Sequence, residues 1–206
     1  MAYPVTVRIE PLITNRNRLT VAFRIILAIP HIILVGGLGI AATNHPDSQS
    51  FGAHGGILGI AAVVLAIVSW FTLVIAGSHI PGIRHYTTFY MRWRARAVAY
   101  LMLLQDTYPP FGDAAYPVLI EVVDPPTRRR ATIFFRVILA IPHFVVLALL
   151  FVAWWITAFV SWVIILFTGN YPEGLYNFGV GVLRWMLRLE CYMLLLVDEY
   201  PPFSFD

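Results

Sequence analysis

The chain has 206 residues, of which 59% are hydrophobic and only 12% are charged. With a mean hydropathy of +0.76, it has more apolar residues than a soluble core of this size can bury, which predicts an integral membrane protein. The net charge is only +3 and the basic residues are dispersed, so nucleic acid is not expected as a partner.

The first half of the chain predicts a strand, two membrane crossings and a third helix. Residues 3–10 alternate apolar and polar side chains, which is the pattern of a half-buried strand. Residues 19–42 and 57–76 are long and apolar enough to cross a bilayer, and the polar residues 43–56 between them predict an exposed loop. Residues 83–104 carry aromatic side chains at helical spacing beside arginines, which predicts an amphipathic helix at the membrane interface.

The second half repeats the first. FRIILAIPH at residues 23–31 returns as FRVILAIPH at 135–143, and RWRARAVAYLMLLQDTYPPF at 92–111 returns as RWMLRLECYMLLLVDEYPPF at 184–203. This duplication predicts two tandem units, residues 1–112 and 113–206, and identifies the residues that both copies keep. The most informative retained pairs are Arg24/Arg136, Pro30/Pro142, His31/His143, Arg92/Arg184, Trp93/Trp185, Arg96/Arg188 and Tyr100/Tyr192.

The second unit lacks about twenty residues that the first unit has between its two crossings. In residues 131–167 only Arg136 is charged. One straight helix of that length would measure roughly 55 Å, against roughly 30 Å for the hydrocarbon core. We therefore expect two crossings with a reversal near residues 149–154. A shallow hairpin that dips into one leaflet and returns is the alternative that periodicity leaves open.

The arginines orient the predicted protein. All fourteen basic residues are arginines, and each lies before the first crossing of a unit, in the first two turns of that crossing, or after the second crossing. The positive-inside rule then places both termini, both strands and both amphipathic helices in the cytoplasm. The predicted fold class is an all-α, multi-pass integral membrane protein. Each of its two units has a short cytoplasmic strand, a transmembrane hairpin and an interfacial helix, and the strands and YPPF tails form a small cytoplasmic sheet.

The repeated motifs carry a family resemblance. AIPH on the first helix of each unit is followed by R-W-x-x-R, Y-x-x-L-L and D-x-Y-P-P-F, and the second unit adds a Trp-rich helix ending in FTG and then P-x-G-L-Y-x-F. The chain thereby resembles the DUF4389 family over nearly its whole length. The resemblance implies a bacterial membrane protein, here in tandem, located in the inner (cytoplasmic) membrane. It implies no activity and supplies no catalytic residues.

Arg24 and His31 are seven residues apart, hence on one face of a helix, and Arg136 and His143 repeat this spacing. One hypothesis is that the two histidines ligate a haem across the axis between the units, with the arginines near its propionates. We favour a structural role, in which each arginine reaches the headgroups or caps a carbonyl and each histidine hydrogen-bonds a neighbouring helix. No metal site and no cofactor is expected.

The amphipathic helices present a second set of candidate residues, namely Arg92, Trp93, Arg96, Arg184, Trp185 and Arg188. Arginine on an aromatic-bearing helix at the membrane surface suits anionic lipid headgroups, and it also suits the acidic face of a partner protein. A solvated edge without a specific ligand is the third interpretation. The tryptophans are expected to be the largest anchors for a partner, whereas the unrepeated Arg94 is expected to tolerate replacement by Leu.

Asp106 and Asp198, each just before Tyr-Pro-Pro-Phe, are the acidic residues that both copies keep. We predict that each forms a structural salt bridge with a retained arginine of its own unit. The sequence contains no nucleophile with a base, no phosphate-binding loop and no zinc spacing, so an enzyme is not expected. The leading functional hypothesis is an accessory or scaffold subunit of a larger membrane protein complex. The alternatives are a small transporter or channel and a haem- or pigment-binding subunit.

Overall fold

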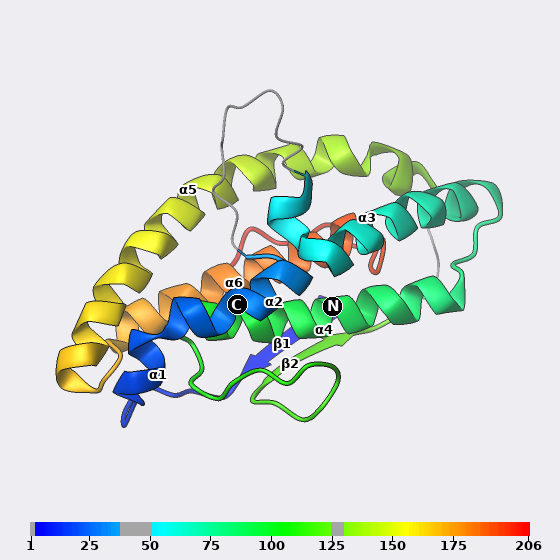
Figure 1. Ribbon diagram of the computed structural model, residues 1–206. Coiled ribbons are helices and arrows are strands. Elements are labelled where there is room, and N and C mark those ends of the chain that lie inside the picture. Colours follow the sequence, from blue (N-terminus) through cyan, green and yellow to red (C-terminus); the bar gives the residue numbers. More distant parts are fainter. Residues whose placement is uncertain (1–2, 38–50, 125–129) are drawn as a thin grey trace.

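The structure is a computed structural model that describes residues 3–37, 51–124 and 130–206. Residues 38–50, which include the end of the first predicted crossing and most of the predicted loop, lie outside the described residues. The elements in chain order are β1 (Val5–Ile9), α1 (Arg18–Ala22), α2 (Arg24–Val35), α3 (Phe51–Ile75), α4 (Pro81–Leu101), β2 (Val118–Val122), α5 (Arg130–Thr168) and α6 (Glu173–Met193). The chain is thus mostly helical with one small sheet (Figure 1).

The sheet takes one strand from each half of the chain. β1 and β2 pair antiparallel, with Val7 opposite Ile120, which occupies the equivalent place in the second copy. Val5 and Val118 are buried on the face toward the helices, as the alternating pattern predicts. The YPPF segments do not join the described sheet, which corrects that part of the expectation. Because each unit supplies one strand, neither unit completes the sheet alone.

Helices α4 and α6 pack against both the sheet and the long apolar helices. In Figure 1 the strands lie on one side of α4 and α5 lies on the other. From Tyr90 to Tyr100 nearly every residue of α4 is buried, and α6 is buried in the same way from Gly179 to Leu189. These helices are therefore a middle layer of the protein and not amphipathic helices lying freely at an interface.

Helix α5 is continuous over 39 residues. The predicted reversal near residues 149–154 is wrong: these residues are helical, and Trp154 is fully buried. The sequence between residues 130 and 168 has no glycine and a single proline, Pro142, so it contains no residue that ends a helix near the expected turn. Figure 1 shows α5 curving around one side of the molecule.

Helices α2 and α3 together correspond to α5. Gly36 ends α2 and Gly56 bends α3, both at positive φ. They lie so close that a Cβ on Gly56 would come within 2.5 Å of the Gly36 nitrogen. The part of α3 that follows Gly56 therefore begins next to the end of α2. Position by position, the buried residues of the two segments coincide, and they are Val21/Ile133, Arg24/Arg136, Ala28/Ala140, His31/His143, Val35/Leu147, Ala62/Trp154, Ala66/Ala158, Ser69/Ser161 and Leu73/Ile165.

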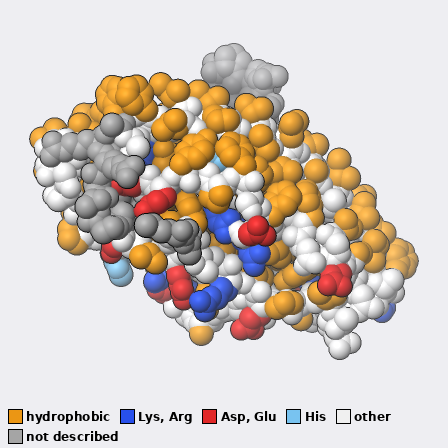
Figure 2. Space-filling view, turned by 180° about the vertical axis from the view of Figure 1, so that it is seen from behind, with side chains coloured by type: hydrophobic (Ala, Val, Ile, Leu, Met, Phe, Trp, Pro, Cys, Tyr) orange, Lys and Arg blue, Asp and Glu red, His pale blue; other side chains and the backbone are white. Residues whose placement is uncertain are grey.

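The opposite faces of α2, α3 and α5 are apolar and exposed. Residues Gly56–Ile75 and Thr132–Thr168 form helices long and apolar enough to cross a membrane, and only 22% of the most apolar window of each is buried. A core helix of a soluble protein is mostly buried, so this exposure favours a membrane protein. Figure 2 shows hydrophobic side chains along the upper edge of the molecule and charged side chains in the middle and lower part.

Hydrogen bonds between the two halves occur in equivalent pairs. Trp70 Nε1 donates to the Ile133 carbonyl at 3.2 Å, and its counterpart Trp162 Nε1 donates to the Val21 carbonyl at 2.9 Å. The phenols of Tyr3 and Tyr116 likewise donate to the carbonyls of Glu199 and Thr107 in the opposite half. Reciprocal contacts, in which residue i of one copy contacts j of the other and j contacts i, are the pattern that a twofold relation between the two sequence repeats produces.

Candidate functional site

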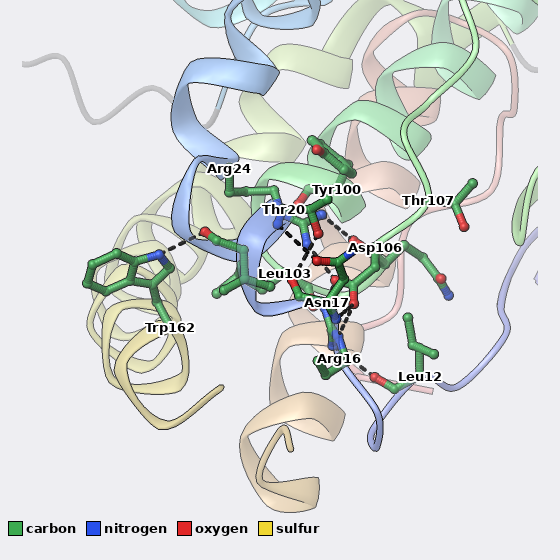
Figure 3. Close-up of polar contacts among 12 residues, drawn as sticks. Leu12, Arg16, Asn17, Thr20, Arg24, Tyr100, Leu103, Asp106, Thr107 and Trp162 are labelled. Atoms are coloured by element: carbon green, nitrogen blue, oxygen red, sulfur yellow. Dashed lines mark hydrogen bonds and ion pairs between the residues drawn. The ribbon is translucent and has the colours of Figure 1, made fainter. Parts of the chain in front are cut away.

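Arg24, the retained arginine of the first unit, is the first residue of α2, and its side chain lies against the C-terminus of α4. We call the group that it forms there the Arg24 cluster (Arg16, Arg24, Tyr100 and Asp106). The Arg24 Nη2 donates to Asp106 Oδ1 at 2.5 Å, and its Nη1 donates to the carbonyls of Tyr100 and Gln105. The guanidinium carbon lies 4.0 Å from the centroid of the Tyr100 ring. The last carbonyls of a helix have no partner within the helix and attract a cation, which explains this position. Figure 3 shows the arrangement.

A second arginine, Arg16, completes the cluster. Its Nη2 donates to Asp106 Oδ1 at 2.7 Å and its Nε to Oδ2 at 2.9 Å, while the backbone amide of Asn17 donates to Oδ2 (Figure 3). Sequence reasoning missed Arg16, although the repeat contains the signal, because Arg16 and Arg24 have the same spacing as Arg128 and Arg136. Arg128 lies outside the described residues.

The Asp106 carboxylate is fully engaged by these donors. Burial alone would raise the pKa of Asp106, but the hydrogen bonds and charge of Arg16, together with the Asn17 amide and Arg24, lower it below its ordinary value. Both oxygens accept two hydrogen bonds each. A carboxylate held in this way is a structural anion and has little capacity left to accept a proton from a substrate.

A left-handed residue at the end of α4 brings Asp106 to the arginines. Leu103 has φ of 65°, and the amide of Leu104 donates back to the Ala99 carbonyl at 2.8 Å. The second copy repeats this turn, with Leu195 at φ of 63°. A leucine in this conformation costs roughly 1 to 2 kcal/mol, which the charged hydrogen bonds that follow the turn offset.

The second unit builds the same arrangement, which we call the Arg136 cluster (Arg136, Tyr192 and Asp198). The Arg136 Nη2 donates to Asp198 Oδ1 at 2.9 Å, and its Nη1 donates to the carbonyls of Tyr192 and Val197. The guanidinium carbon lies 4.3 Å from the Tyr192 ring centroid. The predicted salt bridge between each retained aspartate and an arginine of its own unit is therefore confirmed. The arginines cap the C-termini of α4 and α6, and their side chains are only 1% and 3% exposed.

His31 is held by an aromatic cage. The Trp93 Nε1 donates to His31 Nδ1 at 3.0 Å, Phe111 stacks on the imidazole with centroids 4.6 Å apart, and Tyr108 lies against it at 5.0 Å. This cage fixes the YPPF segment of the first unit onto α2, and it confirms that the histidine hydrogen-bonds a neighbouring helix.

His143 has an equivalent cage of its own. Trp185 Nε1 donates to His143 Nδ1 at 2.9 Å, and the rings of Phe203 and Tyr200 lie 4.0 and 4.8 Å from the imidazole. His31 is 1% exposed and His143 is fully buried, each among residues of its own unit. Both Nδ1 atoms accept from tryptophan, and one face of each ring is covered by phenylalanine. This geometry lends no support to a haem bound between the two histidines.

We expect His31→Leu to destabilise the protein by about 1 to 3 kcal/mol, because it leaves the buried Trp93 N–H without an acceptor. His31→Asn should retain most of the stability, since the asparagine Oδ1 can take the place of Nδ1. Thermal unfolding in detergent measures both. Trp93→Phe in the His31→Leu background should recover part of the loss by removing the unpaired donor. Equal losses for Leu and Asn would show that the hydrogen bond contributes nothing.

The two halves are joined by a partly buried ion pair that the repeat does not contain. Arg94 of α4 donates from Nε to both carboxylate oxygens of Glu190 of α6, at 2.8 and 2.7 Å, and from Nη1 to the Val35 carbonyl at 2.8 Å. Burial alone would lower the pKa of Arg94, but the charge of Glu190 and the contribution of Tyr90 raise it, so the guanidinium stays charged. The expectation that Arg94 tolerates replacement by Leu therefore conflicts with the structure.

Four of the six candidate residues on the amphipathic helices are buried within the protein. Trp93 and Trp185 are 8% and 6% exposed and bind the histidines, and Arg96 and Arg188 are 4% and 9% exposed. Arg96 bonds the Gly112 carbonyl and Asp113, and Arg188 lies over the Tyr3 ring. These four do not form the predicted lipid-binding or partner-binding face. The other two, Arg92 and Arg184, are half-buried.

A protein family is defined over segments that contain the Arg136 cluster, the His143 cage, α5 and both YPPF segments, whereas Arg16, Arg24 and His31 precede the first of these segments. The profile of the domain of unknown function DUF4389 matches residues 51–112 and 130–204. The chain belongs to the DUF4389 family. The matched segments contain the YPPF motifs and most of the residues that contact them, which confirms the resemblance found in the sequence. No curated protein and no solved structure is significantly similar to the chain.

Proposed function

We propose that the chain is a non-enzymatic scaffold: an accessory subunit that lies in the bacterial cytoplasmic membrane and joins a larger assembly of membrane proteins. The observation that carries the proposal is the contrast between its polar and apolar side chains. Inside the protein, Arg24 and Arg136 pair with Asp106 and Asp198, and the two histidines bond tryptophans, whereas large apolar side chains are exposed along α2, α3 and α5. These exposed apolar faces suit binding to other molecules, whereas the buried polar side chains are already used in structural contacts.

The exposed aromatic residues of the YPPF segments are the contact points that we infer for partner subunits. Phe111 is 58% exposed and Phe203 is 52% exposed, and each is held rigidly against a buried histidine. Aromatic side chains that are exposed and already ordered lose little entropy when a partner covers them. They replace Trp93 and Trp185, which the structure buries, as anchors. We also propose that the half-buried Arg92 binds anionic lipid headgroups. Both termini of the chain are proposed to lie in the cytoplasm.

The test is native extraction. The protein should stay in membranes after a carbonate wash, and mild detergent should release it in a discrete complex with other membrane subunits. Phe111→Ala together with Phe203→Ala should weaken that complex, whereas Leu119→Ala, a comparably exposed apolar residue on the sheet, should not. Purified protein should be colourless. A protein that extracts alone and monodisperse, with or without these substitutions, would overturn the scaffold function.

A further inference from the structure

The exposed apolar face is longer than a bilayer is thick. Exposed apolar side chains run in one stripe along the whole of α5, and they include Phe134, Ile138, Ile141, Val145, Leu149, Val152, Ile156, Phe159 and Phe167. At about 1.5 Å per residue this stripe extends roughly 50 Å, compared with roughly 30 Å for the hydrocarbon core. A crossing helix would leave a large apolar part of the stripe in water. A helix lying along the membrane covers all of it.

Both ends of α5 are tied to the side of the molecule that holds the sheet. Its first residue follows shortly after β2. At its other end, the Gly169 carbonyl accepts from the Arg16 amide at 2.9 Å, and the Tyr171 amide donates to the Ile13 carbonyl at 2.7 Å. Ile13 and Arg16 belong to the short connection that follows β1. The helix therefore leaves the sheet side and returns to it.

The segment formed by α2 and α3 is anchored in the same way. It is preceded by α1, which begins directly after Arg16 and Asn17, and these two residues bind Asp106. After it ends, Arg84 at the start of α4 forms an ion pair of 2.5 Å with Asp124, two residues beyond β2. The reciprocal contacts between the halves place the two long segments in equivalent positions, on the side of α4 and α6 away from the sheet.

We propose that the protein occupies one leaflet of the membrane, with the stripes of α2, α3 and α5 in the acyl chains of that leaflet and the sheet in the cytoplasm. This inference rests on the membrane location in the proposed function and specifies the partner surface, a single phospholipid monolayer. The exposed face of the sheet carries Arg8 and Glu121, which suits water. The exposed rings of the two YPPF segments lie beside α2 and α5, where aromatic side chains favour the level of the headgroups.

Single cysteines distinguish this arrangement from either crossing. In a Cys191→Ala background, which installs the residue that the first copy has at this position, cysteine replaces Glu121, Leu149 or Asn170 in turn. Oriented membrane vesicles are treated with a membrane-impermeant maleimide on one side or the other. Glu121→Cys and Asn170→Cys should react from the same side, and Leu149→Cys should react from neither. Leu149→Cys should still react with a membrane-permeant maleimide, which shows that its thiol is present.

Each alternative has its own result. Labelling of Leu149→Cys from the side opposite Glu121→Cys would show a spanning hairpin, and labelling of Asn170→Cys from that side would show a single crossing by α5. Either result overturns the one-leaflet proposal and leaves the membrane location intact. Release of the protein by carbonate, with Leu149→Cys open to impermeant reagent, would instead contradict the membrane location itself. Thermal unfolding of each variant in detergent confirms that it is folded.

Discussion

Asp106→Asn should destabilise the protein by about 3 to 5 kcal/mol, the cost of leaving a buried charge without its partner. The side chains of Arg16 and Arg24 are 0% and 1% exposed, and both depend on this carboxylate. The substitution preserves the size of the side chain, so the loss measures the charge. Unfolding by SDS in mixed micelles gives the free energy.

The matched control is Glu121→Gln. Arg8 and Glu121 are 4.0 Å apart with side chains 70% and 60% exposed, and an ion pair of this kind contributes at most about 1 kcal/mol. Acid provides a second check. Because the folded pKa of Asp106 lies below its ordinary value of 3.8, its contribution is present above that pH and is lost as the pH falls through the folded pKa. The difference between wild type and Asp106→Asn should shrink there. Equal losses for the two variants would contradict a structural role for the cluster.

Arg94→Met should cost about 3 to 5 kcal/mol when made alone, because it leaves Glu190 partly buried against α4 without the guanidinium that bonds both of its oxygens. Methionine is the residue that the second copy has at this place, Met186, and Val98 is the counterpart of Glu190. Met186 and Val98 are both buried. The double variant Arg94→Met with Glu190→Val therefore introduces an apolar pair that this fold already accommodates.

We expect the double variant to recover most of the stability, since a well-packed apolar pair often replaces a buried ion pair without loss. The same SDS unfolding measurement gives the coupling energy between the two positions. Arg92→Met serves as the control, because the Arg92 side chain is 42% exposed and pairs with the half-exposed Asp113. If Arg94→Met leaves the free energy of unfolding unchanged, the expectation that only the repeated arginines contribute to stability is correct.

Much of the local structure was predictable because the signals are local. The alternating residues 3–10 gave a strand, observed as Val5–Ile9, and the helical spacing of residues 83–104 gave a helix, observed as Pro81–Leu101. The duplication identified Arg24, Asp106 and their counterparts, and the structure confirms that each aspartate binds an arginine of its own unit. The repeated residues are those that stabilise the fold, and in this protein they do so through contacts inside each unit.

The predictions that the structure contradicts rest on helix length or on an assumed surface position and not on a local sequence signal. The expected reversal in residues 149–154 rests on bilayer thickness, although nothing in that sequence ends a helix. Their position beside arginines predicts a surface location for Trp93 and Trp185, whereas their indoles bind buried histidines. The methionine at the equivalent place in the second copy predicts that Arg94 is dispensable. A contact between the halves occurs at two equivalent places, and the two copies can have different residue types there. An ion pair at one of these places is therefore not visible as a repeated motif in the sequence.

The distance between the two ends of α5 tests the central claim most directly. Spin labels on cysteines at Phe134 and Phe167, which are 59% and 78% exposed, can be measured by pulsed electron paramagnetic resonance in lipid bilayers. A continuous α5, on which the account of the apolar face rests, predicts a separation of more than about 35 Å, given a rise of about 1.5 Å per residue and the curvature of α5. A separation below about 20 Å, as in two antiparallel neighbouring helices with axes about 8 to 10 Å apart, would contradict it.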